Sequence, residues 1–176
     1  NPHIFVRSPE KICGFSGDLT NMETLYIFKD FFNKILKSKN FESRSNQIYL
    51  NPEKRENYKF NSSINRIEES DLIILIGTNP RYEATMLNAR IRKSYIQNNL
   101  SIFSLNDVGD LTYPYKNLKG DTKTIKEITE NTNEISTLIK NAKKPLIILG
   151  ESALAKESGK YIFESLKSYL HSINKI

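Results

Sequence analysis

The residues best suited to ligand chemistry directly follow the most apolar run of the sequence, Leu72–Ile76. They are Gly77, Thr78, Asn79 and Arg81. A glycine lets a ligand approach the backbone closely, Thr78 and Asn79 offer hydrogen bonds, and an arginine can bind a phosphate through two parallel hydrogen bonds. The same residues also suit a plain turn that leaves a buried strand and begins a helix. The chain has no GxGxxG or GxxxxGK[ST] motif, so these residues alone leave both interpretations open.

The cysteine and histidine content argues against nucleophilic catalysis and against a metal site. The chain has one cysteine, Cys13, and two histidines, His3 and His171, and none of them falls in a recognisable catalytic motif. A cysteine nucleophile needs a neighbouring base, so we expect Cys13 to be a small core residue. The acidic residues within 68–71 are explained by a helix that ends where a strand begins. We therefore predict no catalytic residue and no metal site in this chain.

The basic charge of the chain invites a nucleic-acid interpretation that the rest of the sequence does not support. Lys and Arg number 26 and Asp and Glu number 20, which gives a net charge of +6. The basic residues are scattered, and Lys is abundant together with Asn and Ile, which indicates a bias toward A/T-rich codons. No aromatic RNA-binding motif or helix-turn-helix spacing accompanies them. We expect no nucleic-acid partner.

Two short segments suit either a protein partner or ordinary packing. Arg90, Arg92 and Lys93 form a basic cluster on an expected helix, which is typical of a solvated face and also of a face against a partner. The segment Tyr113-Pro114-Tyr115 places aromatic side chains in an expected loop. There they would be either an interface anchor or turn packing.

The apolar pattern predicts strands that alternate with helices. Thr20 and Glu23 are spaced as a capping box, and a helical stripe follows them as far as Leu36. Strands are expected at 11–15, 72–76, 100–105 and 146–150, and helices at 20–36, 61–70, 83–98, 124–140 and 157–173, with a loop at 106–120. Parallel strands need such helical crossovers. The sequence therefore predicts an α/β fold with a mainly parallel sheet and helices on both faces.

The predicted fold limits where a ligand would bind and how the chain is divided. Ligands of open α/β sheets lie beyond the carboxyl ends of the strands, where the loops at 16–18, 77–81 and 150–152 qualify. Residues 1–10 are expected to be a tail or connection. Residues 11–176 are expected to form a single α/β domain with an irregular excursion at 38–62. The longest apolar run has five residues against the ~20 that a membrane span requires, so no direct membrane insertion is expected.

One long stretch resembles a known family. Residues Ile67–Leu105 read IEESDLIILIGTNPRYEATMLNARIRKSYIQNNLSIFSL, of which Gly77–Ser94 is the most specific part. The segments DLTYPY at 110–115 and AKKPLIILGESAL at 142–154 extend the likeness, and 17–31 matches more loosely. The chain resembles the molybdopterin-oxidoreductase-like domain of the large iron–sulfur subunit, or G subunit, of NADH:quinone oxidoreductase, which is respiratory complex I.

This resemblance implies a Rossmann-like fold of the molybdopterin oxidoreductase type and a non-catalytic, structural role. The family's iron–sulfur clusters, which pass electrons from NADH toward quinone, are held by a cysteine-rich amino-terminal part that this chain lacks. Since residue 1 is Asn, we expect a piece of a longer subunit, without a cofactor of its own. Its partners would be other peripheral-arm subunits. The location would be the cytoplasmic side of a bacterial inner membrane or, alternatively, the matrix side of the mitochondrial inner membrane.

The resemblance also bears on the loop at 77–81. In molybdoenzymes the GTNP turn and the loop after the next strand help to bind a pterin–guanine dinucleotide, but Asn106-Asp107-Val108-Gly109 departs from the usual second loop. We expect the molybdenum cofactor to be lost, which leaves as vestigial candidates Gly77, Thr78, Asn79 and Arg81. One alternative is a dinucleotide- or nucleotide-binding domain that uses Gly77–Arg81, since 143–150 is also similar to thiamine-diphosphate enzymes. Another is a basic module for RNA or a membrane surface.

Overall fold

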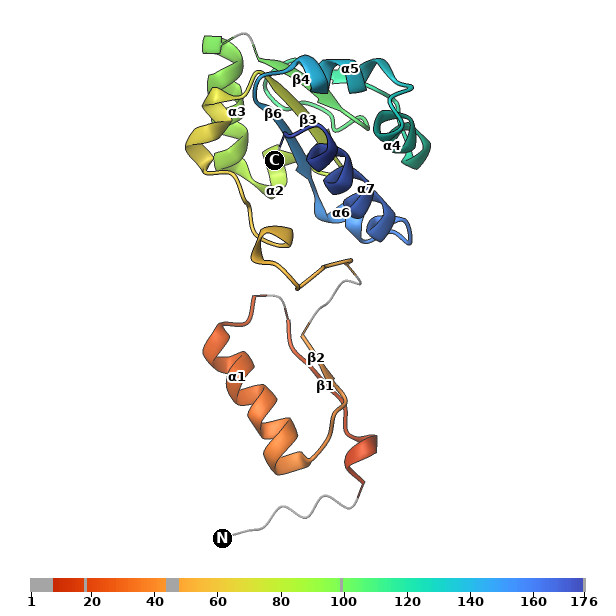
Figure 1. Cartoon of the computed structure of the whole chain (residues 1–176). Coiled ribbons are helices and arrows are strands. Elements are labelled where there is room, and N and C mark those ends of the chain that lie inside the picture. The colour runs from red at the N-terminus through yellow and green to blue at the C-terminus, as the bar shows by residue number, and fades with distance from the viewer. Residues whose placement is uncertain (1–7, 18, 44–47, 99, 176) are drawn as a thin grey trace. The chain divides into compact units, whose positions relative to one another are not determined.

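A computed structural model of the chain describes residues 8–17, 19–43, 48–98 and 100–175 (Figure 1). The chain divides into two compact units, 1–47 and 48–176. Their boundary lies inside the irregular excursion expected at 38–62. That segment has few apolar side chains, so it contributes little to the single hydrophobic core expected over 11–176. Residues 1–7 of the expected tail lie outside the described residues.

The first unit is a strand–helix–strand element. Its parts are the 3-10 helix η1 (Pro9–Lys11), β1 (Gly14–Phe15), α1 (Met22–Asp30), the π-helix η2 (Phe31–Leu36) and β2 (Phe41–Glu42). β1 and β2 are parallel, and Phe32 and Leu36 are its buried apolar side chains among the described residues.

Three local expectations for the first unit are corrected. The strand expected at 11–15 shrinks to Gly14–Phe15, because η1 extends to Lys11 and β1 pairs with β2 through Gly14 and Phe15 only. The helix is capped by Asn21, whose side chain accepts a hydrogen bond from the N–H of Thr24, rather than by Thr20. β2 lies in the segment expected to be irregular. Two-residue strands carry too few side chains for an alternating pattern to be visible in the sequence.

The second unit contains a four-stranded sheet in the order β5-β4-β3-β6, with every pair parallel. The strands are β3 (Leu72–Ile76), β4 (Ser101–Ser104), β5 (Lys116–Asn117) and β6 (Pro145–Leu149). β3 is buried at all five positions, as expected. β6 was expected to be buried but only Ile148 is, because β6 is an edge strand. β5 was not expected, since it is a two-residue strand within the predicted loop at 106–120.

Helices connect the strands of the second unit. They are η3 (Arg55–Asn57), η4 (Ile64–Glu69), α2 (Pro80–Glu83), α3 (Thr85–Asn98), α4 (Thr122–Thr129), α5 (Glu134–Asn141), α6 (Glu151–Leu154) and α7 (Gly159–Ser172). The single helix expected at 124–140 is two helices. Asn131 between them has a left-handed φ of 62°, and Asn133 caps the start of α5. The helix expected from 83 begins after a break at Ala84, where the backbone leaves the helical region.

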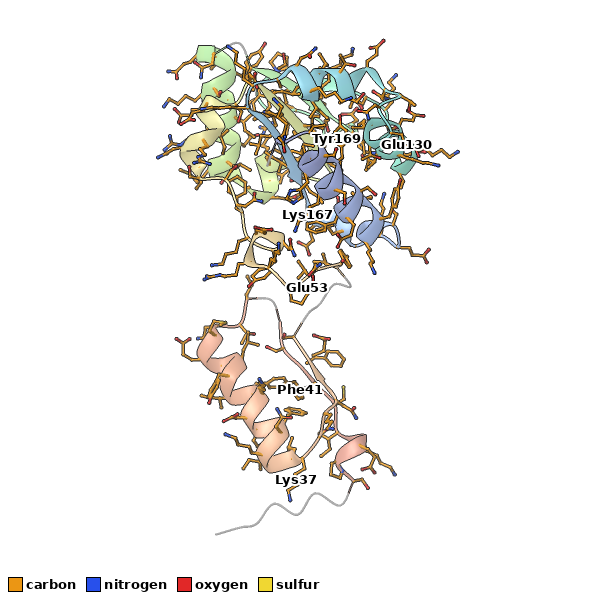
Figure 2. The ribbon with its side chains drawn as sticks, viewed as in Figure 1. Lys37, Phe41, Glu53, Glu130, Lys167 and Tyr169 are labelled. Carbon is orange, nitrogen blue, oxygen red and sulfur yellow. The ribbon has the colours of Figure 1, made fainter. Side chains whose placement is uncertain are left out.

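Helices cover both faces of the sheet, as the sequence predicts. Alternate side chains of a strand point to opposite faces. Leu72, Ile74 and Ile76 therefore pack with apolar residues of α4, α5 and α7, whereas Ile73 and Leu75 pack with residues of η4 and α3. The segment that runs from Tyr49 through η3 lies against α7. Tyr49 donates to Glu164 at 2.8 Å. Lys167, which is labelled in Figure 2, donates to Asn57 at 2.5 Å.

Candidate functional site

The candidate loop at 77–81 lies where β3 ends, next to the loops that follow β4 and β6. These three strands are parallel neighbours, so their carboxyl ends share one edge of the sheet. Gly77 has a φ of 60°, and its carbonyl accepts a 2.6 Å hydrogen bond from the hydroxyl of Ser152. The structure thus brings together the candidate loops at 77–81 and 150–152. The loop at 16–18 belongs to the other unit, and its Asp18 lies outside the described residues.

The loops after β3 and β6 approach each other too closely for larger residues. A Cβ on Gly77 would lie 2.5 Å from the Cβ of Ala153, and a Cβ on Gly150 would lie 2.2 Å from the carbonyl oxygen of Gly77. Gly150 also donates its N–H to the carbonyl of Ile76 at 2.8 Å. The absence of a side chain at Gly77 therefore allows the two loops to pack closely. The space beside its Cα is occupied by Ala153 and is not open to a ligand.

The polar groups at the start of α2 bind a carboxylate of the same helix. Thr78 donates its hydroxyl to Glu83 at 2.9 Å, and the N–H of Asn79 donates to the other oxygen of that carboxylate at 2.8 Å. The side chain of Asn79 accepts from the N–H of Arg81 at 3.1 Å and donates to the carbonyl of Val108 at 2.8 Å. The N–H groups at this helix end thus already have partners within the chain.

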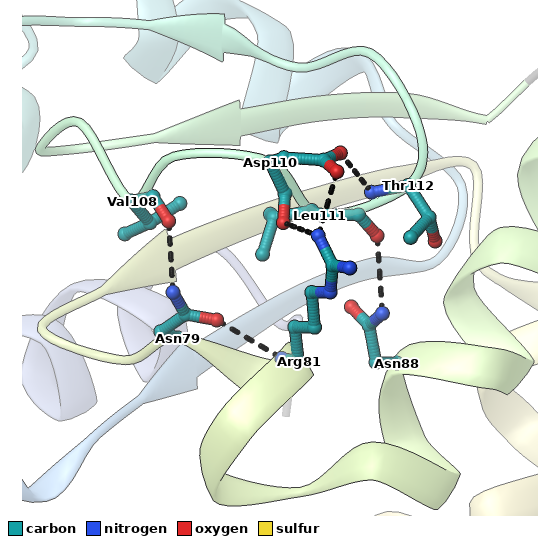
Figure 3. Close-up of polar contacts among 7 residues, drawn as sticks. All are labelled: Asn79, Arg81, Asn88, Val108, Asp110, Leu111 and Thr112. Carbon is teal, nitrogen blue, oxygen red and sulfur yellow. Dashed lines mark hydrogen bonds and ion pairs between the residues drawn. The ribbon is translucent and has the colours of Figure 1, made fainter.

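Arg81 is engaged by the loop that follows β4 (Figure 3). One nitrogen of its guanidinium donates to the carbonyl of Asp110 at 2.8 Å and to its carboxylate at 2.6 Å. The other carboxylate oxygen accepts from the N–H of Thr112 at 2.7 Å. The N–H of Thr112 and the Arg81 guanidinium hold the pKa of Asp110 below its ordinary value. A charged carboxylate is therefore paired with the arginine that was the candidate phosphate ligand.

Two of the residues that close this site were not identified from the sequence. Glu83 stands four residues after the helix cap Asn79, close to the three-residue spacing of a capping box, and this spacing was the available signal. Asp110 lies 29 positions from Arg81. Because that contact depends on how two strands are placed side by side, no local pattern indicates it.

The segment 113–115 packs against the rest of its own unit, which favours turn packing over an interface anchor. Tyr113 is buried and donates its hydroxyl to Asn88 at 2.7 Å, while Asn88 donates to the carbonyl of Leu111 at 3.0 Å. Burial raises the pKa of Tyr113. Tyr115 is partly buried and donates to Asp107 at 2.8 Å. These aromatics fix the loop that carries Asp110.

Two residues of the basic cluster form ion pairs within the chain, and the third forms none among the described residues. Arg90 and Lys93 both pair with the carboxylate of Glu68, Lys93 at 2.7 Å. Their hydrogen bonds, that of Lys93 first, hold the pKa of Glu68 below its ordinary value. Arg92 is exposed, and no side chain that the structure describes pairs with it.

The cysteine and histidines form no catalytic group among the described residues. Cys13 is exposed, not a core residue as expected, because it lies before the short strand β1 rather than within a buried one. His171 is exposed on α7, and His3 lies outside the described residues. Across residues 8–17, 19–43, 48–98 and 100–175, no three His, Cys, Asp or Glu side chains are grouped to hold a metal ion. Over the same ranges no helix is long and apolar enough to cross a membrane.

Comparison with known protein families identifies the family of this chain. Its sequence matches the family model described as molybdopterin oxidoreductase over residues 4–176. The chain belongs to the molybdopterin oxidoreductase family. The resemblance carried by Gly77–Ser94 and the α/β fold of this family are thereby confirmed.

Within the molybdopterin oxidoreductase family, the chain is similar to named respiratory subunits. The NADH-ubiquinone oxidoreductase 75 kDa subunit of Reclinomonas americana is 38% identical over 175 residues, covering 93% of this chain and 25% of that protein. The mitochondrial NADH dehydrogenase iron-sulfur protein 1 of Solanum tuberosum is 33% identical, covering 96% and 23%. The G-type subunit of the NADH-quinone oxidoreductase of Rickettsia conorii is 34% identical, covering 94% and 24%. The chain spans about a quarter of the length of these relatives.

The loop at 77–81 does not fit the anionic pterin dinucleotide that the family name implies. A pyrophosphate needs free N–H groups, hydroxyls or cations. Here the hydroxyl of Thr78 and the N–H of Asn79 bind Glu83, and Arg81 binds Asp110. A phosphate at this loop would meet two carboxylates instead of free donors. No chemical step through such a cofactor follows from these residues.

Proposed function

We propose that this chain is a non-catalytic structural domain of a G-type iron–sulfur subunit of NADH:quinone oxidoreductase. The observation that carries the proposal is the closed loop after β3, where Glu83 and Asp110 occupy the donors that an ancestral ligand would need. The relatives, at 33–38% identity, are all named as subunits of this enzyme. The domain keeps a ligand-binding architecture whose site is filled by its own side chains.

The proposal includes the setting of the domain. The iron–sulfur clusters that pass electrons from NADH toward quinone belong to other parts of the subunit, and the molybdenum cofactor has been lost. The partners are other peripheral-arm subunits, without nucleic acid. The domain is peripheral, on the cytoplasmic side of a bacterial inner membrane or on the matrix side of a mitochondrial one. Its contribution is to support the arm mechanically.

A native gel of gently solubilised membranes from the source cell tests the proposal. The gel is probed with an antibody to this chain and stained for NADH dehydrogenase activity. We expect the antibody signal and the activity in one large band. A small species that carries the antibody signal, without NADH activity, would show that the proposal is wrong.

Nucleotide binding at Gly77–Arg81 is tested separately by titration of the chain with a fluorescent guanosine diphosphate. We expect no saturable binding below about 1 mM, because the anion position is taken by the chain's own carboxylates. Asp110→Asn is the informative second variant, since it removes the negative charge paired with Arg81 and keeps the side-chain shape, while Arg81 retains its hydrogen bond to the backbone carbonyl at position 110. Micromolar binding by the wild type that is lost in Arg81→Ala would support the nucleotide-binding alternative instead.

A further inference from the structure

The outer face of α3 carries apolar and basic side chains together. Met86 and Ile96 are 72% and 67% exposed, and Ala89 and Arg92 are also exposed. Met86, Ala89, Lys93 and Ile96 follow one another at steps of three, four and three residues, so they lie along one face of the helix. The opposite face of α3 is already used, since Ile91 is fully buried against the sheet.

A hollow on this face has the arrangement of a helix-packing site. It has a volume of about 320 Å³ and is lined by Ala89, Arg92, Lys93, Ile96 and Gln97. The first four stand at i, i+3, i+4 and i+7, which are the positions that form the hole for one side chain of a facing helix. The small side chain of Ala89 leaves room for that side chain to enter.

The charge around the hollow specifies the partner. α3 contains Arg90, Arg92 and Lys93 and no Asp or Glu. Glu68 is shared by Arg90 and Lys93, and no described side chain neutralises Arg92. The cluster thus has three cations and one carboxylate, Glu68, which pairs with two of them. A carboxylate on a partner could therefore pair with Arg92.

We propose that Met86, Ala89, Arg92, Lys93 and Ile96 form a docking surface for an amphipathic, acidic helix of another subunit. This inference rests on the proposed function, which supplies the neighbouring subunits. An apolar side chain of the partner fills the hole over Ala89, and a carboxylate one turn away pairs with Arg92. The mixture of exposed apolar and charged side chains is typical of an interface between separately folded chains rather than of a domain core.

Site-specific cross-linking in the assembled enzyme tests this surface. A photoreactive benzoylphenylalanine replaces Ile96 in the subunit, and the complex is irradiated and analysed by mass spectrometry. The matched control places the same group at Leu138 of α5, which is 42% exposed and lies on the other side of the sheet. We expect position 96, and not 138, to cross-link to a helical peptide of another subunit that carries Asp or Glu beside apolar residues.

A charge reversal then tests the role of Arg92. Arg92→Glu in the same background should lower the yield of that cross-link about tenfold, because like charges repel across an interface, and Arg92→Lys should retain most of it. Lys123→Glu on α4 is the control and should leave the yield unchanged. The thermal unfolding of the isolated Arg92→Glu chain should equal that of the wild type, since Arg92 has no described partner.

Several results would overturn the inference and separate it from the proposed function. A cross-link from position 96 to a second copy of this chain, to an acid-poor segment or to the same subunit would identify a different occupant. Equal yields from Arg92→Glu and the wild type would show that charge does not select the partner. If the wild-type subunit fails to purify with NADH dehydrogenase activity, the proposed function is wrong, and this inference is wrong with it. If it purifies with the activity but position 96 gives no cross-link, the inference alone is wrong.

Discussion

At the scale of single residues, Glu83 and Asp110 determine what the loop after β3 can accept. Each carboxylate binds a donor that a phosphate would otherwise use, namely Thr78 and Arg81. The pKa of Asp110 is lowered by the N–H of Thr112 and by Arg81, so its negative charge persists to a lower pH than that of an ordinary aspartate. Two acidic side chains of the chain itself therefore occupy the donors that a phosphate at this loop would need.

Gly77 is the residue whose replacement tests the close contact between the loops. Gly77→Ala should lower the free energy of unfolding by about 2–4 kcal/mol, from a left-handed φ of 60° and a Cβ 2.5 Å from that of Ala153. Urea denaturation followed by circular dichroism measures this. The control is Gly109→Ala, which has a φ of 71° and no atom near the added Cβ. It should cost only about 1 kcal/mol. Equal costs for the two variants would show that the contact with Ala153 adds nothing.

At the scale of elements, the sequence predicts what depends on local pattern. The predicted strand of five apolar residues, β3, and its parallel neighbour β4 are confirmed. Each is long enough for the pattern of apolar side chains to indicate a buried strand. The two-residue strands β2 and β5 were missed, since they exist only through pairing with distant segments. Likewise Gly77 and Arg81 were identified as candidates from local types. Their partners Ala153 and Asp110 depend on long-range packing that one sequence does not display.

The central position of β3 makes Leu75 the test of the sheet. Leu75→Asp should abolish folding of the second unit, because it places an unpaired carboxylate at a fully buried site and removes the apolar contacts of the leucine. Circular dichroism and size-exclusion chromatography measure this. Ser101→Asp, at an exposed position at the start of β4, is the control and should stay folded. A soluble Leu75→Asp chain that unfolds cooperatively would show that the assignment of β3 is wrong.

Asp71 joins the start of β3 to the start of β6. Its carboxylate accepts hydrogen bonds from the N–H groups of Lys143 at 2.6 Å and Lys144 at 2.9 Å. Partial burial raises the pKa of Asp71. The hydrogen bonds from these two N–H groups lower it and contribute to a net pKa below the ordinary value of 3.8. The resulting stability is therefore fully present above about pH 4. It is lost as the pH falls through the lowered pKa.

Asp71→Asn tests this junction. The variant should lower the free energy of unfolding by about 1 kcal/mol at pH 7, a modest loss because the site is largely exposed. The difference from the wild type should shrink as the pH falls below 4, where the wild-type carboxyl is protonated. Urea denaturation at several pH values measures both. Glu157→Gln is the control, since no described residue pairs with Glu157. A pH-independent difference for Asp71→Asn would contradict the assigned role of its charge.

At the scale of the whole molecule, the two units differ in how much apolar surface each buries. Every member of the two large apolar clusters lies between residues 67 and 173. In the first unit the buried apolar side chains among the described residues are Phe32 and Leu36. Since apolar burial is the main stabilising contribution to folding, the second unit holds nearly all of the stability of the chain.

This difference predicts the outcome of dividing the chain at the boundary between the units. A fragment of residues 48–176 should fold and unfold cooperatively with a Tm within about 2 °C of the full chain, because both clusters remain whole. A fragment of residues 1–47 should show no cooperative transition, since so short a segment with two buried apolar side chains cannot offset its conformational entropy. Circular dichroism during heating measures both fragments. A 48–176 fragment that melts much earlier than the full chain would show that the first unit stabilises the second. The contacts that close the site at 77–81 all come from the second unit, so the 48–176 fragment should also keep the closed geometry of that loop.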